Sequence, residues 1–145
     1  MKLNLGCGGD ILEGFTNHDL TKHRSEIDIC FDLNKFPYPI EDESYDQVHC
    51  YDVLEHLDNP LQVMNEIHRI LKPDGVFKAK CCGWENPNAW VDITHKRLFD
   101  VKSMDYFDPE TEIGQIYSYY TDCKWKIENK HYDVRKNPHF IMRKI

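Results

Sequence analysis

The chain has 145 residues and a formal net charge of −7, with 41% hydrophobic and 30% charged side chains. This length suits a single domain over residues 1–145, large enough to bury a core without disulfides. The negative charge excludes a general attraction to nucleic-acid phosphates or anionic membranes. Small molecules or proteins are therefore the expected partners.

The six cysteines form no Cys-x-x-Cys pair, and Cys81 and Cys82 are adjacent. This pattern is typical of free thiols in a reducing compartment, so we expect a cytoplasmic protein with no metal site. His18 and His23 lie near Asp19 on an irregular loop, which is a poor arrangement for metal ligands. No apolar stretch approaches membrane-spanning length, and a signal peptide is not expected, so the fold is expected to start almost at residue 1.

Five short strands are expected in the first eighty residues, at 2–5, 15–18, 27–30, 45–50 and 75–80. One amphipathic helix lies between the last two. Asp58 or Asn59 can cap it, Pro60 suits its first turn, and apolar residues recur at helical spacing as far as Leu71. Strands that alternate with connectors indicate an α/β fold with a mostly parallel sheet.

The second half of the chain has a different pattern. Residues 84–123 are rich in Trp, Tyr, Asn and Pro without clear periodicity. Their aromatic side chains either line a substrate pocket or supply core packing. Residues 125–132 and 140–145 are expected to form two closing strands, joined by a hairpin-type turn at 136–138.

A glycine loop, Gly6-Cys7-Gly8-Gly9, follows the first strand. Glycines there let the backbone approach a ligand closely, although a plain tight turn is the alternative. Only five residues separate Gly9 from Phe15, too few for the helix whose N-terminus holds a pyrophosphate in dinucleotide sites. The short connector therefore favours S-adenosylmethionine (SAM), which has no phosphate, over NAD.

Asp19 lies 13 residues after Gly6, against about 20 in the dinucleotide fingerprint. The shortfall matches the missing helix, and a carboxylate there can accept hydrogen bonds from both ribose hydroxyls. A solvated turn residue is the alternative. Asp32 and Leu33, after the third strand, can face an adenine; Asp28 competes for that role.

Three further residues follow the fourth strand. In an open α/β sheet the ligand lies beyond the carboxyl ends of the strands, where the strand order reverses. Tyr51 and Asp52 are therefore expected beside the methyl group. His56 is a base, a substrate contact or a structural hydrogen-bonding residue.

Several motifs together resemble the class I SAM-dependent methyltransferases, in particular the small group with an Asn-Leu-Gly-Cys-Gly first motif. The motifs are residues 4–8, 17–19, 31–34, 37–39, 44–46, 54–56 and 71–75, with a further match at the Asp-x-Thr-His-x-Arg stretch, 92–97. The resemblance implies a three-layer Rossmann-like sheet in the order 3-2-1-4-5-7-6, with strand 7 antiparallel. Here its first helix is truncated, and Asp10 and Asn4 replace a commoner glycine and acidic residue.

The resemblance also implies site residues. It places the glycine loop on the methionine part of SAM, Asp19 on the ribose and the Asp32 region at the adenine. The expected cofactor-binding residues are Leu5, Gly6, Cys7, Gly8, Gly9, Asp19, Leu20, Asp32, Leu33, Tyr51 and Asp52. His56 and His95 are the expected catalytic residues, and Asp92, His95 and Arg97 are expected to bind the substrate, unless 92–97 is merely a solvated helix start.

The sequence thus predicts a methyltransferase that moves a methyl group from SAM to a small-molecule or glycan acceptor, releasing S-adenosylhomocysteine. Methyl transfer from a sulfonium is an in-line displacement that needs alignment more than a metal or a covalent intermediate. Two alternatives stay open. One is a methyltransferase-like subunit without catalysis, in which a homo- or hetero-oligomer completes the site. The other is an NAD- or nucleotide-binding oxidoreductase.

Overall fold

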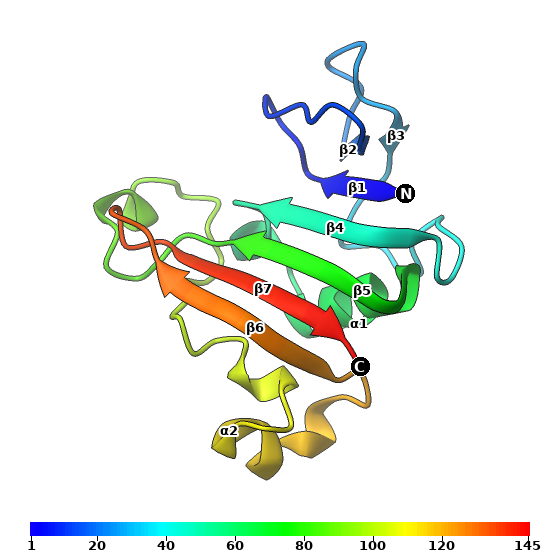
Figure 1. Cartoon of the computed structure of the whole chain (residues 1–145). Helices are drawn as coiled ribbons and strands as arrows, with labels where there is room; N and C mark the ends of the chain where they lie inside the picture. Colours follow the sequence, from blue (N-terminus) through cyan, green and yellow to red (C-terminus); the bar gives the residue numbers. More distant parts are fainter.

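The computed structural model describes residues 1–145 and contains one seven-stranded sheet (Figure 1). Its strands are β1 (Lys2–Leu5), β2 (Thr16–Asp19), β3 (Ile29–Cys30), β4 (Tyr45–Tyr51), β5 (Leu71–Lys80), β6 (Trp125–Tyr132) and β7 (Pro138–Lys144). Their order is β3-β2-β1-β4-β5-β7-β6, parallel except that β7 is antiparallel to both neighbours. The expected strand order and the antiparallel seventh strand are confirmed.

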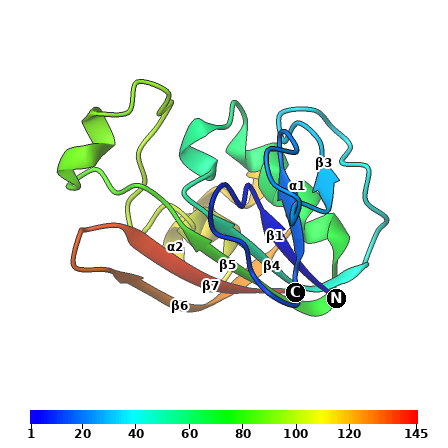
Figure 2. The ribbon, with the colours of Figure 1, turned by 90° about the horizontal axis from the view of Figure 1, so that it is seen from above.

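The helices are fewer than in a full three-layer arrangement. They are α1 (Pro60–Ile70), α2 (Glu112–Ile116) and four short 3₁₀ turns, η1 (Leu54–His56), η2 (Pro87–Trp90), η3 (Asp105–Phe107) and η4 (Ser118–Tyr120). No helix connects β1 to β2, which confirms the truncated first helix. Both α-helices lie on the same side of the sheet (Figure 2). The second helical layer is missing because the segments after β1 and β2 fold only as turns.

The core lies between the sheet and α1. Val48 of β4 and Phe77 of β5 are fully buried, whereas their neighbours in sequence alternate toward the open face. Met64 and Ile67 of α1 belong to the same buried cluster. Burying one such side chain contributes about 1.5–3 kcal/mol. One face of the sheet therefore carries most of the core.

No helix of the structure reaches the length and apolarity that crossing a membrane requires.

The element boundaries differ from the expected ones in three places. β3 is only two residues long, and Ile27 is buried but lies outside the strand pairing. β5 begins earlier than expected, since Leu71 already pairs with Tyr45 before an irregularity in the register. The hairpin turn lies before Pro138, which is the first residue of β7 and pairs with Tyr132.

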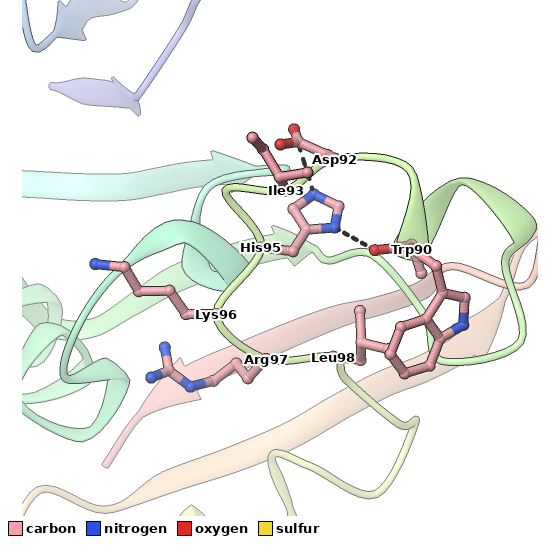
Figure 3. Close-up of a pocket in the computed structure, with 8 residues that line it drawn as sticks. Trp90, Asp92, Ile93, His95, Lys96, Arg97 and Leu98 are labelled. Carbon is pink, nitrogen blue, oxygen red and sulfur yellow. Dashed lines mark hydrogen bonds and ion pairs between the residues drawn. The ribbon is translucent and has the colours of Figure 1, made fainter.

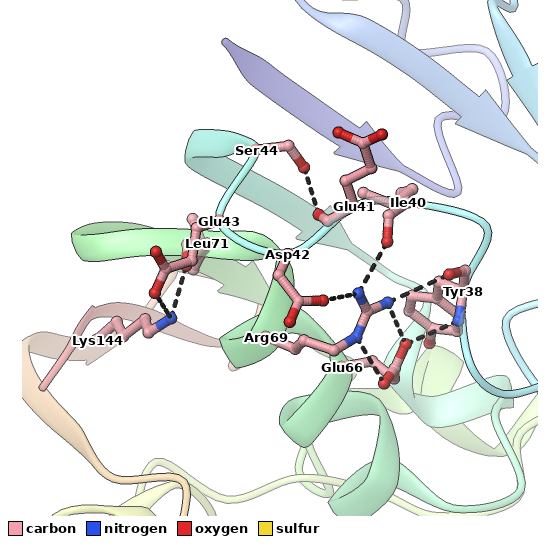
Figure 4. A network of polar contacts seen from close by, with 10 residues as sticks. All are labelled: Tyr38, Ile40, Glu41, Asp42, Glu43, Ser44, Glu66, Arg69, Leu71 and Lys144. Carbon is pink, nitrogen blue, oxygen red and sulfur yellow. Dashed lines mark hydrogen bonds and ion pairs between the residues drawn. The ribbon is translucent and has the colours of Figure 1, made fainter.

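Polar side chains cap the start of helix α1 and anchor its other end to a neighbouring loop. The Asn59 side chain accepts a hydrogen bond from the Gln62 N–H at 3.2 Å, so Asn59 is the N-cap. Near the other end, the Arg69 guanidinium donates to both Glu66 carboxylate oxygens, at 2.7 and 3.1 Å, and to Asp42 at 2.6 Å (Figure 4). Glu66 also accepts from the Tyr38 N–H at 2.7 Å. These contacts bind the loop before β4 to the helix.

We expect this network to make stability depend on acid pH. Burial raises the pKa of Glu66, but Arg69 and the Tyr38 N–H outweigh it and hold that pKa below the ordinary 4.5. The contribution of Glu66 is therefore complete above pH 4.5 and is lost as the pH falls through its lower folded pKa. Glu66→Gln should lose about 1–3 kcal/mol of unfolding free energy at pH 7.

Urea denaturation at pH 7 and at pH 3.5 measures this effect. The wild type should lose more stability on acidification than Glu66→Gln, because the variant has no carboxylate left to protonate. Glu41→Gln is the matched control, since Glu41 is exposed and should behave as the wild type. Equal losses on acidification in all three proteins would contradict the role given to Glu66.

Candidate functional site

The glycine loop turns sharply at the end of β1. Gly6 and Gly8 have φ angles of 62° and 52°, a region that side chains rarely adopt. A Cβ at Gly6 would lie 2.5 Å from Cγ2 of Val53, whereas a Cβ at Gly8 would meet nothing within 4 Å. Gly6 is therefore required by both its backbone angle and the close approach of the loop after β4, and Gly8 by its angle alone.

Two side chains of β2 hold this loop in place. His18 is buried; its Nδ1 accepts from the Gly6 N–H at 3.2 Å and its Nε2 donates to the Phe31 carbonyl at 2.9 Å. Burial lowers the pKa of His18, in keeping with a neutral ring. The Asp19 carboxylate accepts from the N–H groups of Gly8 and Leu20, each at 2.7 Å. Both nitrogens of His18 are used, so its role is structural, which the sequence did not indicate.

A cavity of about 390 Å³ opens beside the loop, and we call it the glycine-loop cavity. Its volume falls within the range of about 300–1,000 Å³ typical of small-molecule sites. It is lined by Gly6, Gly8, His18, Asp19, Leu20, Phe31, Asp32, Leu33, Asn34, Asp52, Val53, His56 and Leu57. Seven of the eleven expected cofactor-binding residues thus line one cavity.

The other four expected cofactor-binding residues lie elsewhere. Leu5 and Cys7 are buried, and Gly9 is exposed away from the cavity lining. Tyr51 is 37% exposed and lies beside His49, with ring centroids 5.3 Å apart. Alternation along β4 gives the reason, because Tyr51 shares the open face with His49 while Cys50 faces the core.

The acidic residues separate into lining and structural groups. Asp32 lines the cavity and accepts from the Asn34 N–H at 2.9 Å. Asp28, its competitor, does not line the cavity, and its carboxylate accepts from the Asn17 N–H at 2.7 Å. Asp52 has a left-handed backbone, with φ of 58°, and forms an ion pair of 2.6 Å with Lys80.

A second cavity, which we call the polar cavity, adjoins the first. It has a volume of about 320 Å³, and its lining residues are Asp52, Glu55, His56, Lys80, Cys82, Asn86, Asn88, Asp92, His95, Arg135 and Asn137. Asp52 and His56 line both cavities. A ligand in the glycine-loop cavity and a ligand in the polar cavity would therefore meet at these two side chains.

The structure brings the two expected catalytic histidines together. The Lys96 N–H donates to the Glu55 carbonyl at 2.8 Å, which ties the loop after η2 to η1. The rings of His56 and His95 then lie edge to face, with centroids 4.8 Å apart. Both line the polar cavity, although 39 positions separate them in the sequence.

Hydrogen bonds orient both rings. Nδ1 of His95 lies 2.9 Å from the Ala89 carbonyl, which can only accept, so Nδ1 carries the proton (Figure 3). Nδ1 of His56 lies 2.9 Å from Oγ1 of Thr94, whose own hydroxyl donates to Asp92 at 2.6 Å. In the neutral form of each ring, the lone pair therefore lies on Nε2.

Glu55 lines the polar cavity, a position that the sequence reasoning did not assign to it. It is only 1% exposed, and its Oε1 accepts from the Cys82 N–H at 2.8 Å. Its Oε2 is buried with no hydrogen-bond partner, and burial raises the pKa of the carboxyl group. Its place in the Leu-Glu-His motif was the available signal, but nothing local indicates that an acidic residue of a short turn is buried.

Arg97 has a different place from the one expected. Its guanidinium donates to the carbonyls of Leu57 and Asp58, and the neighbouring Lys96 pairs with the Asp58 carboxylate. Arg97 lines a third cavity, of about 500 Å³, together with Asp92 and His95 (Figure 3). Residues 92–97 contain no helix, so the alternative interpretation as a helix start is wrong.

The aromatic residues of 84–123 mostly do not line cavities. Trp90 lines the third cavity and is 76% exposed, and Trp84 is 54% exposed. Tyr106, Tyr117 and Tyr120 pack against one another, with ring centroids 5.2–5.6 Å apart. Packing is therefore the main role of these tyrosines.

Similar proteins share this sequence pattern and fold. The methyltransferase domain family matches residues 7–79, half of the chain. The ubiquinone biosynthesis O-methyltransferase of Actinobacillus pleuropneumoniae serotype 7 (strain AP76) is 31% identical over 101 residues, covering 52% of this chain and 42% of that protein. The chain thus spans less than half the length of the curated relatives that it matches.

Solved structures with little sequence identity share the fold. A SAM-dependent methyltransferase from Archaeoglobus fulgidus has a TM-score of 0.68 at 14% identity, covering 98% of this chain and 85% of the other. One from Mesorhizobium loti has a TM-score of 0.66 at 13% identity, covering 98% and 89%. A chain of the Haloferax volcanii complex that contains the Trm112 methyltransferase activator has a TM-score of 0.68 at 14% identity, covering 98% and 81%.

The matched segment contains the glycine loop from Cys7 onward, both β2 side chains that hold it, and the Leu-Glu-His motif. The strand order, including the antiparallel β7, is the one that the family resemblance implies. SAM is the methyl donor implied by this family and fold. The chain belongs to the methyltransferase domain family of class I SAM-dependent methyltransferases.

Proposed function

We propose that the chain binds SAM in the glycine-loop cavity and directs its methyl group toward an acceptor in the polar cavity. The observation that carries this proposal is the meeting of the two cavities at Asp52 and His56. An in-line displacement needs a donor and a nucleophile on opposite sides of the transferred carbon. Two adjoining cavities supply that arrangement, and alignment can contribute about 7–11 kcal/mol in ideal cases.

The lining of the glycine-loop cavity suits SAM. No helix begins behind the loop, so the loop lacks the N-terminus that favours a phosphate group. We assign the loop to the methionine part, Asp19 to the ribose and Asp32 with Leu33 to the adenine. The Asp19 carboxylate accepts two backbone N–H groups and retains lone pairs for ribose hydroxyls. The same features disfavour an NAD-dependent oxidoreductase.

We propose His56 and His95 as the catalytic residues. When bound, SAM supplies an activated methyl group on a sulfonium. A hydroxyl acceptor must lose its proton as the new bond forms, and a positioned base typically contributes about 10²–10⁴-fold. The Nε2 lone pair left on each ring, and the place of both rings in the polar cavity, support this role. Asp92 would then act by orienting His56 through Thr94.

A small molecule with a hydroxyl group is the proposed acceptor. The curated relatives are ubiquinone biosynthesis O-methyltransferases, and the net charge of −7 disfavours nucleic acid. We further propose that residues 1–145 work as one domain in the cytoplasm, since the seven strands share one sheet and all six cysteines are free. The polar lining of the acceptor cavity is consistent with a polar ligand.

A second function is a methyltransferase-like subunit that acts with a partner. The open face of the sheet, where this fold class carries helices, favours it, and one similar structure contains the Trm112 methyltransferase activator. Such a subunit would form a stable complex, either with a second copy of this chain or with a different protein.

Isothermal titration calorimetry distinguishes these functions. We expect S-adenosylhomocysteine and SAM to bind with one site per chain, and NAD to give no heat. Heat with NAD but not with SAM would favour the oxidoreductase. No heat with either SAM compound, together with a stable hetero-complex, would favour the partner subunit.

A further inference from the structure

Three side chains of the polar cavity direct metal-binding atoms at one another. Glu55 offers a carboxylate oxygen, and His56 and His95 each offer a ring nitrogen. These atoms all lie within 4.8 Å of one another. The cluster joins η1 to the loop after η2, and its residues are held by the backbone bond from Lys96 to Glu55.

The Glu55 carboxylate lacks a compensating charge. Its side chain is buried, its Oε2 has no hydrogen-bond partner, and no lysine or arginine pairs with it. Of the two basic residues that line the polar cavity, Lys80 is engaged by Asp52, and Arg135 forms no ion pair with Glu55. A buried carboxylate without a cation is costly, and a bound cation would remove that cost.

The two histidines are oriented as metal ligands commonly are. Each donates its Nδ1–H to an oxygen, of Ala89 or of Thr94, and leaves its Nε2 lone pair free. Such an outer hydrogen bond fixes the tautomer and direction of a ligating imidazole. Nε2 of His95 also lies 3.7 Å from a carboxylate oxygen of Asp92, which stabilises a cation on Nε2, either a proton or a metal ion.

We propose that Glu55, His56 and His95 form a binding site for a divalent transition-metal ion, with positions left open for an oxygen of the acceptor. Two imidazoles and one carboxylate suit the divalent first-row transition metals, from Mn²⁺ to Zn²⁺, better than Mg²⁺ or Ca²⁺, which prefer oxygen ligands alone. Ligand distances of about 2.0–2.2 Å place donors about 3–3.5 Å apart around one ion. The donors, at up to 4.8 Å, would close by on the order of 1 Å on binding.

The site lies where the proposed acceptor would bind, and only this placement of the acceptor rests on the proposed function. A hydroxyl oxygen bound to a divalent ion loses its proton to solvent water more readily, because the ion stabilises the alkoxide or phenoxide. His56 and His95 would then serve by holding the ion, in place of taking the proton themselves. The ion would also orient the acceptor oxygen toward the methyl group.

Titration of the metal-free full chain with Co²⁺, followed by visible absorption, tests the site. We expect one Co²⁺ per chain, with ligand-field bands and without the sulfur-to-cobalt charge-transfer band of a cysteine ligand. Glu55→Gln and His95→Gln should weaken Co²⁺ binding by at least about tenfold. Glu55→Gln keeps the size of the side chain and an oxygen for the Cys82 N–H, and thermal melts check that both variants fold.

His131→Ala is the matched control, because His131 is an exposed histidine of β6 outside the three cavities. It should bind Co²⁺ as the wild type does. Absence of a Co²⁺ site, or a site unchanged in folded Glu55→Gln and His95→Gln, would overturn the proposal, as would a cysteine charge-transfer band. Calorimetry with S-adenosylhomocysteine on the same samples separates the two proposals, since either ligand can bind without the other.

Discussion

Replacing Gly6 with alanine is expected to weaken S-adenosylhomocysteine binding by about 30-fold or more, because two costs add at this position. The left-handed backbone, with φ of 62°, costs an alanine about 1–2 kcal/mol. The new Cβ would also lie 2.5 Å from Cγ2 of Val53, and such overpacking costs about 1–3 kcal/mol more. Val53 lines the glycine-loop cavity, so relief of the clash would displace either the loop or the cavity wall.

Gly8→Ala is the matched control for this prediction. Gly8 has a similar φ of 52°, but a Cβ there meets nothing within 4 Å. Gly8→Ala should therefore incur only the cost of the left-handed backbone. If all of that cost appears in binding, the affinity falls by about fivefold to thirtyfold. Adding Val53→Ala to Gly6→Ala should restore part of the lost affinity, because it removes the clash and leaves the strain.

Calorimetry on the three variants, with thermal melts to confirm folding, measures these differences. Equal affinities in Gly6→Ala and Gly8→Ala would show that the contact with Val53 is unimportant for binding. Failure of the double variant to bind more tightly than Gly6→Ala would lead to the same conclusion.

His95→Ala is expected to lower kcat by about 10²–10⁴-fold and to leave S-adenosylhomocysteine affinity within about twofold of the wild type. His95 lines the polar cavity and not the glycine-loop cavity, so the variant should affect chemistry at the acceptor and spare the cofactor. The loss is expected whether His95 takes the proton or holds a metal ion.

The measurement is the initial rate of labelled methyl transfer from SAM to a hydroxyl acceptor found by screening, alongside calorimetry. His131→Ala provides the control and should retain the wild-type rate. Full turnover by a folded His95→Ala would remove His95 from the mechanism. A large loss of S-adenosylhomocysteine affinity would instead place His95 in the cofactor site.

Much of the fold was predictable because its signals are local. Short strand-like runs marked β1 and β4 nearly to the residue, and Pro60 with its preceding cap marked the start of α1. The five residues between Gly9 and Phe15 cannot form a full helix in any tertiary context, so the truncated first helix was also determined by the sequence. The order of the strands came from the family resemblance, since no local signal contains it.

Some site residues could have been placed better from the sequence. Tyr51 lies two residues after His49 on β4, so the two side chains share one face of the sheet. The buried Val48 and Cys50 occupy the alternate positions, which face the core. Strand alternation therefore already directs Tyr51 to the open face, away from the glycine-loop cavity. Asp19 and Asp32, by contrast, follow their strands directly and line the cavity as the motif positions suggested.

The acceptor side of the site was decided by tertiary structure alone. His56 and His95 meet through one backbone bond between segments distant in the sequence, and no periodicity reports such a contact. The same packing buries Glu55 and directs Arg97 to the carbonyls of Leu57 and Asp58. Local sequence determines strands, turns and the glycine loop through backbone preferences, whereas the burial and partners of a charged side chain depend on which distant segments pack around it.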